Sequence, residues 1–284
     1  MRKILFFGLI ILMSYNLPVE AQTAPQKKGI LLITFGTSYP EAQKAFDHVD
    51  TLVKRQWPGT DVFWAYTSRF IRNKLRNRGI EIDSPAGALA KMCELGYTHV
   101  AVQSLHIIPG AEFHDVLQTV DAFTQIPKGV PEIKVGGPLL CSHRDMEQMA
   151  QIICNTFKTG NKEAVLLMGH GTHHGSNVYY PAFQYYLNKY SDHHFIGTVE
   201  GFPLLEDVMN ELRKRNYRKV KLVPFMSVAG DHAQNDMAGQ EPQSWKSQLE
   251  AAGYEVSVEM KGLAEMDEVV NIWLNHLNEV FDAL

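Results

Sequence analysis

Cysteine is scarce in this sequence, with three residues among 284, and none of them forms a C-x-x-C pair. A disulfide framework is therefore excluded, because three thiols can form at most one bridge. A structural zinc protein also fits poorly, because such sites are closed and usually rich in cysteine. We expect Cys93, Cys141 and Cys154 to be buried free thiols.

The sequence also lacks a strong excess of either charge. Its 27 basic and 31 acidic residues give a net charge of −4, which leaves no electrostatic footprint for nucleic acid. No stretch reaches the roughly 20 apolar residues that cross a membrane. Hydrophobic residues make up 45% and charged residues 20%, which is typical of a folded protein with room for two domains.

The longest apolar run lies near the start of the chain. Arg2 and Lys3 precede the run at 4–13, and small residues follow at Val19 and Ala21. This pattern is typical of a secretory signal peptide covering residues 1–21, although a short buried helix would read similarly. We therefore expect an exported protein, most simply a periplasmic one.

After residue 21, short β-rich runs alternate with amphipathic stretches of helical length. This alternation predicts an α/β fold of two Rossmann-like domains with parallel sheets, residues 22–158 and 159–284. The last helix, from residue 265 onward, is expected to pack back across the two lobes. The predicted strands are 29–35, 61–66, 99–105, 132–135, 164–168, 194–199, 219–223 and 255–258.

The second half repeats the first in sequence. Segments 31–37 and 166–172 align, and so do segments 65–70 and 197–202. A third match joins the stretch from residue 96 to Gly110 with the stretch from residue 216 to Gly230. Three matches in the same order indicate one unit of strands and helices that was duplicated and fused.

The two copies differ where strands pass into loops. Where the first copy has Phe35, Ser68 and Glu112, the second copy has His170, Glu200 and His232. The carboxyl ends of parallel strands line the ligand crevice of open α/β sheets, so these three second-copy residues should converge there. Two imidazoles and a carboxylate suit Co²⁺, Fe²⁺, Ni²⁺ or Zn²⁺ and leave coordination positions open.

An ordinary polar role is the alternative for any single histidine in a chain that holds 12 of them. His170 differs because glycines flank it and allow close approach of a ligand, and His232 lies in a similar loop. The remaining candidates are interpreted as ordinary polar side chains, namely His143, His173, His174, His193 and His194.

The ordered set His170-Gly-Thr, Thr198-Val-Glu200-Gly and Gly230-Asp-His232-Ala resembles the anaerobic cobalt chelatase family. These are the sirohydrochlorin cobaltochelatases among the class II tetrapyrrole chelatases, which are related to ferrochelatase. The resemblance covers nearly the whole chain after residue 21, including segments 35–38, 66–69 and 103–106 of the first copy.

The resemblance implies a bilobal fold with a tetrapyrrole cleft between the lobes and a metal site on the second lobe. His170 matches the family's ligand and proton acceptor, while Glu200 and His232 match the other two ligands. It implies a lyase that inserts Co²⁺ as substrate into sirohydrochlorin in cobalamin biosynthesis, with Fe²⁺, Ni²⁺ or Zn²⁺ as alternatives.

A polycarboxylate substrate predicts anion-binding groups near the cleft. Arg69 suits carboxylates because its guanidinium donates two hydrogen bonds, and Ser38 sits at a strand–helix turn that offers a hydroxyl and backbone N–H groups. Phe35 is expected to line the pocket. The substrate-binding set that we predict is Phe35, Ser38, Ser68, Arg69, Gly171 and Thr172.

An exported carrier is the alternative function. Such a protein would hold haem, another tetrapyrrole or a metal in the same cleft without turnover, as in haem or iron acquisition. Bound haem is compatible with the sequence, with His106 and His114 available as axial ligands. A homo-oligomer is equally compatible with it.

Overall fold

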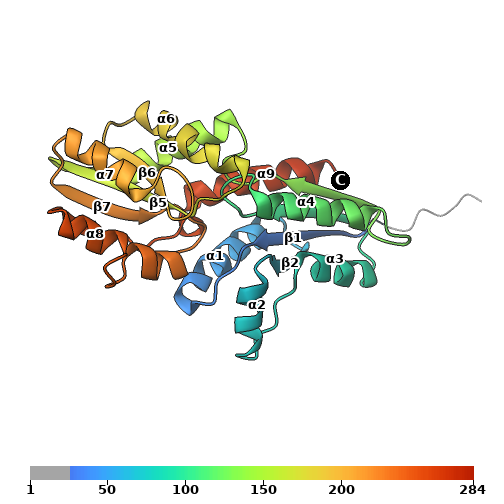
Figure 1. The fold of residues 1–284 in the computed structure, drawn as a ribbon. Helices are drawn as coiled ribbons and strands as arrows, with labels where there is room; N and C mark the ends of the chain where they lie inside the picture. The colour runs from blue at the N-terminus through green and yellow to red at the C-terminus, as the bar shows by residue number, and fades with distance from the viewer. Residues whose placement is uncertain (1–25) are drawn as a thin grey trace, which may run out of the picture.

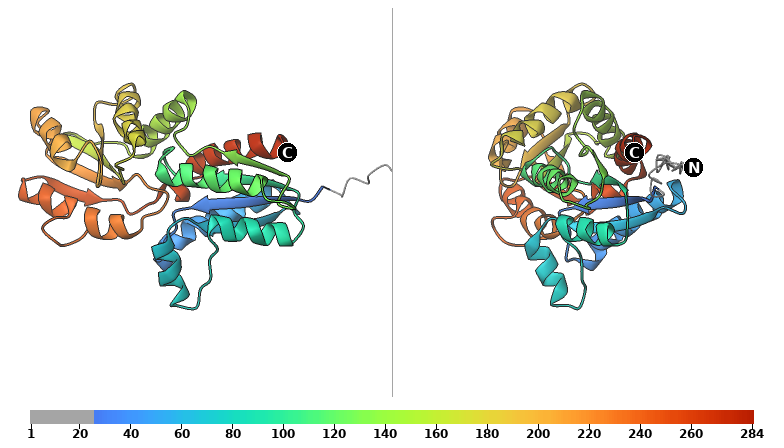
Figure 2. Two further views of the ribbon diagram at one scale, coloured as in Figure 1. Left: turned by 45° about the vertical axis from the view of Figure 1, so that its right-hand side comes forward. Right: turned by 90° about the vertical axis from the view of Figure 1, so that its right-hand side faces the viewer.

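The structure is a computed structural model that describes residues 26–284, so the predicted signal peptide at 1–21 lies outside the described residues. These residues form two lobes side by side (Figures 1 and 2). Each lobe is built on a four-stranded parallel sheet with helices around it. The predicted α/β class with two similar parallel-sheet units is confirmed.

The first lobe contains a sheet with strand order β2-β1-β3-β4. Its central strand β1 is apolar from Ile30 to Ile33, and these residues are fully buried because helices cover both faces of the sheet. The elements are β1 (Lys28–Thr34), α1 (Pro40–Gln56), β2 (Asp61–Tyr66), α2 (Arg69–Arg76), α3 (Pro85–Glu94), β3 (His99–Ser104), α4 (Ala111–Thr124) and β4 (Glu132–Gly136).

The second lobe repeats this topology with the strand order β6-β5-β7-β8. The shared order agrees with the duplication that the sequence predicts. The elements from residue 143 onward are α5 (His143–Thr156), β5 (Glu163–Gly169), η1 (Gly175–Val178), α6 (Tyr179–Asn188), β6 (His194–Thr198), α7 (Leu205–Lys214), β7 (Lys219–Pro224), η2 (Ala233–Met237), α8 (Trp245–Ala251), β8 (Glu255–Val258), η3 (Leu263–Glu265) and α9 (Asp267–Asp282).

Two helices, α5 and α9, each pack on the lobe formed by the other half of the chain. Helix α5 lies against α6 of the second lobe, where Gln151 Nε2 donates to the Tyr190 hydroxyl at 2.8 Å. Helix α9 crosses back and covers β3 and β4 of the first sheet (Figure 1). A division of the chain at residues 158 and 159 follows the sequence repeat, but these two helices do not follow that division.

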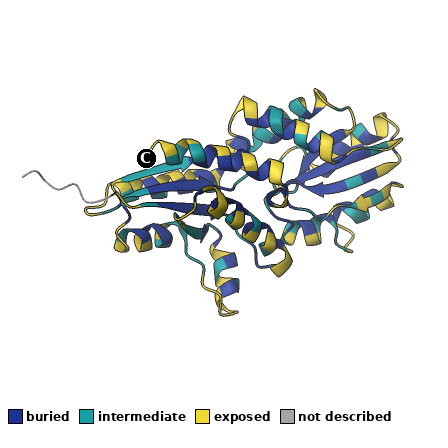
Figure 3. Ribbon diagram, turned by 180° about the vertical axis from the view of Figure 1, so that it is seen from behind, coloured by how far each residue is buried: buried dark blue, intermediate teal, exposed yellow. Residues whose placement is uncertain are grey.

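The hydrophobic core runs continuously through both lobes. Alternate residues of β1 face opposite sides, so Ile30 and Leu32 face α1 and α9, while Leu31 and Ile33 face α3 and α4. The first of these layers continues through α5 and α6 to Val165 on β5. Figure 3 shows the buried strands at the centre of each lobe. The crossing helices therefore join the two sheets into one packed unit.

Some local expectations need correction. All three cysteines are free, but Cys141 is exposed and the other two are only half-buried, because Cys141 lies in the surface turn before α5. Glu112 lies in the first turn of α4 rather than in a loop, because Gly110 already caps that helix. Within residues 26–284, no helix is both long and apolar enough to cross a bilayer.

Candidate metal centre

The three predicted ligands lie at the carboxyl ends of the first three strands of the second sheet. His170 directly follows β5, Glu200 follows β6 by two residues, and His232 lies between β7 and the π-helical turn η2. The backbone N–H of Glu200 donates to the carbonyl of His170 at 2.8 Å. This bond fixes the spacing between two of the ligands, because it extends the parallel pairing of β5 with β6.

Gly171 allows the chain to turn sharply after His170. Its φ of +82° lies in the left-handed region that glycine tolerates best. A Cβ atom at this position would also lie 2.6 Å from the backbone nitrogen of Gly201, beside Glu200. The glycine is therefore required both for the backbone turn and for the close approach of the His170 and Glu200 loops.

The structure brings the three side chains together. One ligating atom of each lies within 4.8 Å of the others. His170 Nδ1 lies 4.0 Å from Glu200 Oε2, and the rings of His170 and His232 lie 4.5 Å apart at 87°. The three side chains are 41%, 51% and 31% exposed, in the order His170, Glu200, His232. An incoming ion and a large substrate can therefore reach them.

Hydrogen bonds orient both imidazoles. His170 Nδ1 lies 2.9 Å from the carbonyl oxygen of Gly171, and His232 Nδ1 lies 2.6 Å from Asp236 Oδ2. A carbonyl oxygen only accepts, so His170 Nδ1 carries the proton, and the carboxylate favours the same tautomer of His232. Both rings are left with a free Nε2 lone pair, which is the arrangement typical of metal-binding histidines.

Asp236 is a functional candidate that the sequence interpretation missed. It lies four residues after His232, within η2, and single-turn π-helices are frequent at functional sites. The spacing of four residues was a usable signal, because such residues share one face of a helical turn. Recognising it required knowing that this loop is helical.

An open hollow of about 680 Å³ adjoins Glu200. The side chain of Asn177 shapes it, because its Oδ1 accepts from the Thr172 N–H at 3.2 Å and its Nδ2 donates to the Phe202 carbonyl at 2.8 Å. Phe202 and Leu204 expose apolar surface there. The lining residues belong to the second lobe, namely Thr172, His173, Asn177, Val199, Glu200, Gly201, Phe202 and Leu204.

Phe35 of the first lobe lies beside His170. It is 44% exposed, and its ring lies 6.5 Å from the ring of His170. The lobes also meet beside His232, where the Tyr39 hydroxyl donates to Asp231 Oδ1 at 2.7 Å. The ends of the first strands of the two sheets therefore face each other at the candidate site.

The other predicted first-lobe residues differ in their surroundings. The Ser38 hydroxyl is enclosed and has no partner among the described residues, and its carbonyl accepts from Arg78 Nη1 at 2.7 Å. The Ser68 hydroxyl accepts from the Ile71 N–H at 3.3 Å and caps α2. Arg69 is exposed in the first turn of that helix.

Most histidines interpreted as ordinary polar side chains have protein partners. His194 is buried, with Nε2 2.9 Å from the Phe157 carbonyl, and burial lowers its pKa. His143 contacts the Tyr186 hydroxyl, His174 contacts Ser176 and His193 contacts Tyr217. His173 differs from this group because it lines the hollow beside Glu200.

Solved structures with the same fold are chelatases. SirB from Bacillus subtilis with Fe³⁺ superimposes with a TM-score of 0.59 at 14% identity, covering 90% of this chain and 96% of that one. SirB from Bacillus subtilis subspecies spizizenii in complex with cobalt gives a TM-score of 0.58 at 15% identity over the same shares. The chain therefore has the two-lobed α/β fold of these structures.

The sequence comparisons are more specific. The profile of the cobalt chelatase (CbiK) family matches residues 28–282, so the chain belongs to that family. It is 41% identical over 260 residues to the sirohydrochlorin cobaltochelatase CbiKC of Nitratidesulfovibrio vulgaris, covering 91% of this chain and 92% of the relative. It is 34% identical over 259 residues to the sirohydrochlorin cobaltochelatase of Salmonella typhimurium, covering 90% and 97%.

Proposed function

We propose that this protein is a sirohydrochlorin cobaltochelatase, which inserts Co²⁺ as substrate into the macrocycle during cobalamin biosynthesis. The observation that carries the proposal is the convergence of His170, Glu200 and His232 within 4.8 Å at the open edge of the second sheet. The names of the relatives and the family support the same activity.

The donor set suits the metal half of the reaction. Two imidazole Nε2 atoms and a carboxylate replace part of the hydration shell of a divalent ion and leave positions open for pyrrole nitrogens. The same donors accept Fe²⁺, Ni²⁺ and Zn²⁺, so the supply of each metal decides which ion is inserted. Glu200 offsets part of the ion's charge while the site holds it.

Insertion must also remove two N–H protons from the macrocycle. When the ion moves from His170 to the pyrrole nitrogens, Nε2 of that ring is freed and takes one proton. The second proton goes to the carboxylate of Glu200, which passes it to solvent because its side chain is half exposed. The charge then balances, because one divalent ion replaces two protons.

The macrocycle is placed in the hollow beside the ligands. Thr172 lines it, Gly171 lets the Glu200 loop pack close to His170, and Phe35 lies beside the His170 ring. Carboxylates of sirohydrochlorin extend toward Arg69, which lies exposed in the first turn of α2. Ser38 and Ser68 complete the predicted set. The hydrogen bonds of the Ser38 carbonyl and the Ser68 hydroxyl hold the backbone at this edge of the first lobe.

Export of the protein is a further part of the proposal. It rests on the charged start, apolar run and small residues of segment 1–21. The test is the mass of the chain recovered from the cell envelope fraction after expression of the full sequence. A chain that begins near residue 22 supports export, whereas a full-length chain confined to the cytoplasm contradicts it.

The activity is tested with the purified protein, sirohydrochlorin and Co²⁺ under anaerobic conditions. Insertion changes the absorption spectrum of the macrocycle, and the expected result is multiple turnovers per chain. Stable binding of sirohydrochlorin or haem without insertion of Co²⁺, Fe²⁺ or Ni²⁺ would contradict the enzyme and favour an exported carrier.

A further inference from the structure

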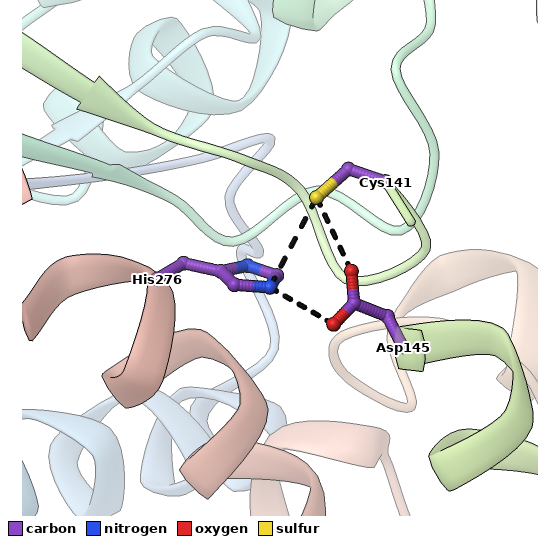
Figure 4. Close-up of side chains that lie close together, drawn as sticks. All are labelled: Cys141, Asp145 and His276. Carbon is purple, nitrogen blue, oxygen red and sulfur yellow. Dashed lines mark hydrogen bonds and ion pairs between the residues drawn. The ribbon is translucent and has the colours of Figure 1, made fainter. Parts of the chain in front are cut away.

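A second cluster of metal-binding side chains lies away from the candidate site, where the crossing helices meet. Cys141 lies in the turn before α5, Asp145 in the first turn of α5, and His276 in the middle of α9 (Figure 4). Cys141 Sγ lies 3.3 Å from Asp145 Oδ2 and 3.9 Å from His276 Nε2. His276 Nε2 lies 3.1 Å from Asp145 Oδ1.

Neighbouring groups hold each member of the cluster in place. His276 Nδ1 lies 3.1 Å from the carbonyl oxygen of Gly137, which holds Nε2 toward the cysteine and the aspartate. The Ser142 hydroxyl donates to Asp145 Oδ2 at 2.7 Å. A Cβ atom at Gly137 would lie 2.5 Å from Cys141 Sγ, so the backbone leaves room for the sulfur at this point.

The separations of the three ligand types fit one tetrahedral ion. Zinc bond lengths of about 2.3 Å to sulfur and about 2.0–2.1 Å to nitrogen or oxygen place neighbouring ligand atoms roughly 3.3–3.6 Å apart. The carboxylate of Asp145 contacts His276 Nε2 through Oδ1 at 3.1 Å and Cys141 Sγ through Oδ2 at 3.3 Å, and the sulfur lies 3.9 Å from Nε2. Rotation of this carboxylate would turn one oxygen toward an ion shared with the other two groups, since one ligand atom of each residue already lies within 4.8 Å of the others.

We propose that Cys141, Asp145 and His276 form a second metal site, which binds Zn²⁺ through thiolate, carboxylate and imidazole. Thiolate and imidazole donors suit Zn²⁺ better than the hard cations Ca²⁺ and Mg²⁺. Asp145 and His276 have side chains that are only 9% and 10% exposed. Cys141 is exposed, so it provides the entry path and leaves the fourth position to water.

Without a metal ion, hydrogen bonds join the three side chains. Burial alone lowers the pKa of His276, but hydrogen bonds with Asp145 and Cys141 outweigh it and raise the pKa to about 10. Zn²⁺ binding requires a neutral imidazole at His276 and a thiolate at Cys141, so protons leave as the ion enters. The ion thereby takes over the role of the Asp145–His276 ion pair.

The ion would join the two crossing helices. Helix α5 packs on the second lobe and α9 packs on the first lobe. The ligands of the cluster come from both helices and from the turn before α5. Zinc bound only by the folded state adds to its stability, since unfolding separates ligands that lie 131 residues apart in sequence. The ion would therefore stabilise the folded state without taking part in the proposed insertion reaction.

Titration of the full chain with Co²⁺ tests the proposal, because cobalt replaces zinc as a spectroscopic probe. The expected result is two ions per chain and a near-ultraviolet charge-transfer band from thiolate to cobalt. His170, Glu200 and His232 contain no sulfur, so only the second site produces this band. Cys141→Ser should remove the band and weaken binding there at least about 100-fold, beyond the loss typical of an outer-shell partner.

Matched variants identify the site and separate it from the proposed function. Cys154→Ser, which removes a half-buried thiol outside the cluster, should keep the band. His170→Ala should keep it as well, although it removes the insertion activity. Cys141→Ser should retain the activity, which also shows that it is folded, and His276→Gln provides a second test.

The thermal midpoint gives an independent readout. Zn²⁺ should raise the midpoint of His170→Ala, in which the first site is disabled, but not that of the double variant His170→Ala/Cys141→Ser. The proposal is overturned if the wild-type chain shows no thiolate band, or if Cys154→Ser loses the band instead. Binding of a single ion that disappears in His170→Ala would also overturn it and would leave the cluster as a buried ion pair.

Discussion

The two lobes share one backbone plan and differ in the side chains placed on it. In the first lobe, the N–H of Ser68 donates to the carbonyl of Phe35 at 3.2 Å. In the second lobe, the N–H of Glu200 donates to the carbonyl of His170 at 2.8 Å. The same strand ends thus present an aromatic ring and a hydroxyl in one lobe, and two metal-binding groups in the other.

The third strand end shows a difference in backbone as well. Glu112 lies in a regular helix that Gly110 caps, whereas His232 follows Gly230 and leads into a π-helical turn. The irregular turn places Asp236 at hydrogen-bonding distance from His232. The equivalent first-lobe position is the buried Val116. The proposed metal centre therefore differs from the equivalent edge of the first lobe in its local backbone as well as in its side chains.

The largest expected effect comes from removing the ligand that distinguishes the lobes. His170→Ala should lower the rate of Co²⁺ insertion by about 10²–10⁴-fold, because it removes a ligand and a proton acceptor. The matched first-lobe variant Phe35→Ala should instead raise KM and leave kcat near the wild-type value. Initial rates followed by absorption check both, and an equal loss of kcat in the two variants would refute the asymmetry.

Alanine at the shared left-handed glycines should destabilise both lobes. Gly36 and Gly171 have φ values of +101° and +82°, and an added Cβ would lie 2.3 Å from the Tyr66 ring or 2.6 Å from Gly201 N. Each variant should lose about 2–4 kcal/mol from strain and overpacking, measured by urea unfolding. Gly59→Ala, with φ of +81° and open space around it, is the control and should lose about 1–2 kcal/mol.

Removing the carboxylate of Asp236, whose equivalent in the first lobe is Val116, should weaken metal binding. Asp236→Asn should lower Co²⁺ affinity at the three-ligand site by about 10–100-fold, because His232 loses the partner that sets its tautomer. Calorimetric titration measures this. Asp192→Asn, which changes an 83% exposed side chain before the start of β6, at the opposite end of that strand from Glu200, should bind Co²⁺ normally. Unchanged affinity in Asp236→Asn would exclude the outer-shell role.

The smallest effect concerns His106 of the first lobe, whose equivalent in the second lobe is Met226. The N–H of Leu105 donates to β1 and the N–H of Phe225 donates to β5, both at 2.8 Å. Because β1 and β5 are the equivalent central strands of the two sheets, the residues that follow, His106 and Met226, occupy equivalent positions. Burial lowers the pKa of His106 to about 4, and its Nε2 is enclosed without a partner among the described residues.

This histidine should make folding stability depend on pH. The unfolded state binds the proton near pH 6.5 and the folded state only near pH 4, so stability is lost as pH falls between these values. Between pH 7.5 and pH 5 the loss should be about 1–2 kcal/mol. His106→Met should remove that part of the pH dependence in urea unfolding. An identical pH profile in both proteins would contradict the assignment.

The sequence was sufficient for the fold class and for the convergence of the three ligands. The fold class followed from the alternation of strands and helices, and the convergence followed from the position of the three residues at the carboxyl ends of parallel strands. The repeat singled out His170, Glu200 and His232, because the first copy has Phe35, Ser68 and Glu112 at the corresponding places. Comparison within one chain thus supplied information that periodicity alone does not contain.

The second cluster could not be predicted in the same way. Cys141 and His276 lie 135 residues apart, and their contact depends on how α9 docks across both lobes. The apolar face of α9 predicts burial but not its partner, because several apolar surfaces would accept it. The capping role of Ser68 is one that the sequence does suggest, since a serine before a helix is a common cap, and its assignment to substrate binding stays a prediction.

The return of α9 to the first sheet has a consequence for biosynthesis of the protein. Trp273 and its neighbours on α9 share a core layer with Ile30 and Leu32, near the opposite end of the chain. During translation, one face of the first sheet therefore stays incompletely covered until the final helix has been synthesised. Truncation of the last 20 residues should thus impair folding of the half of the chain that is made first.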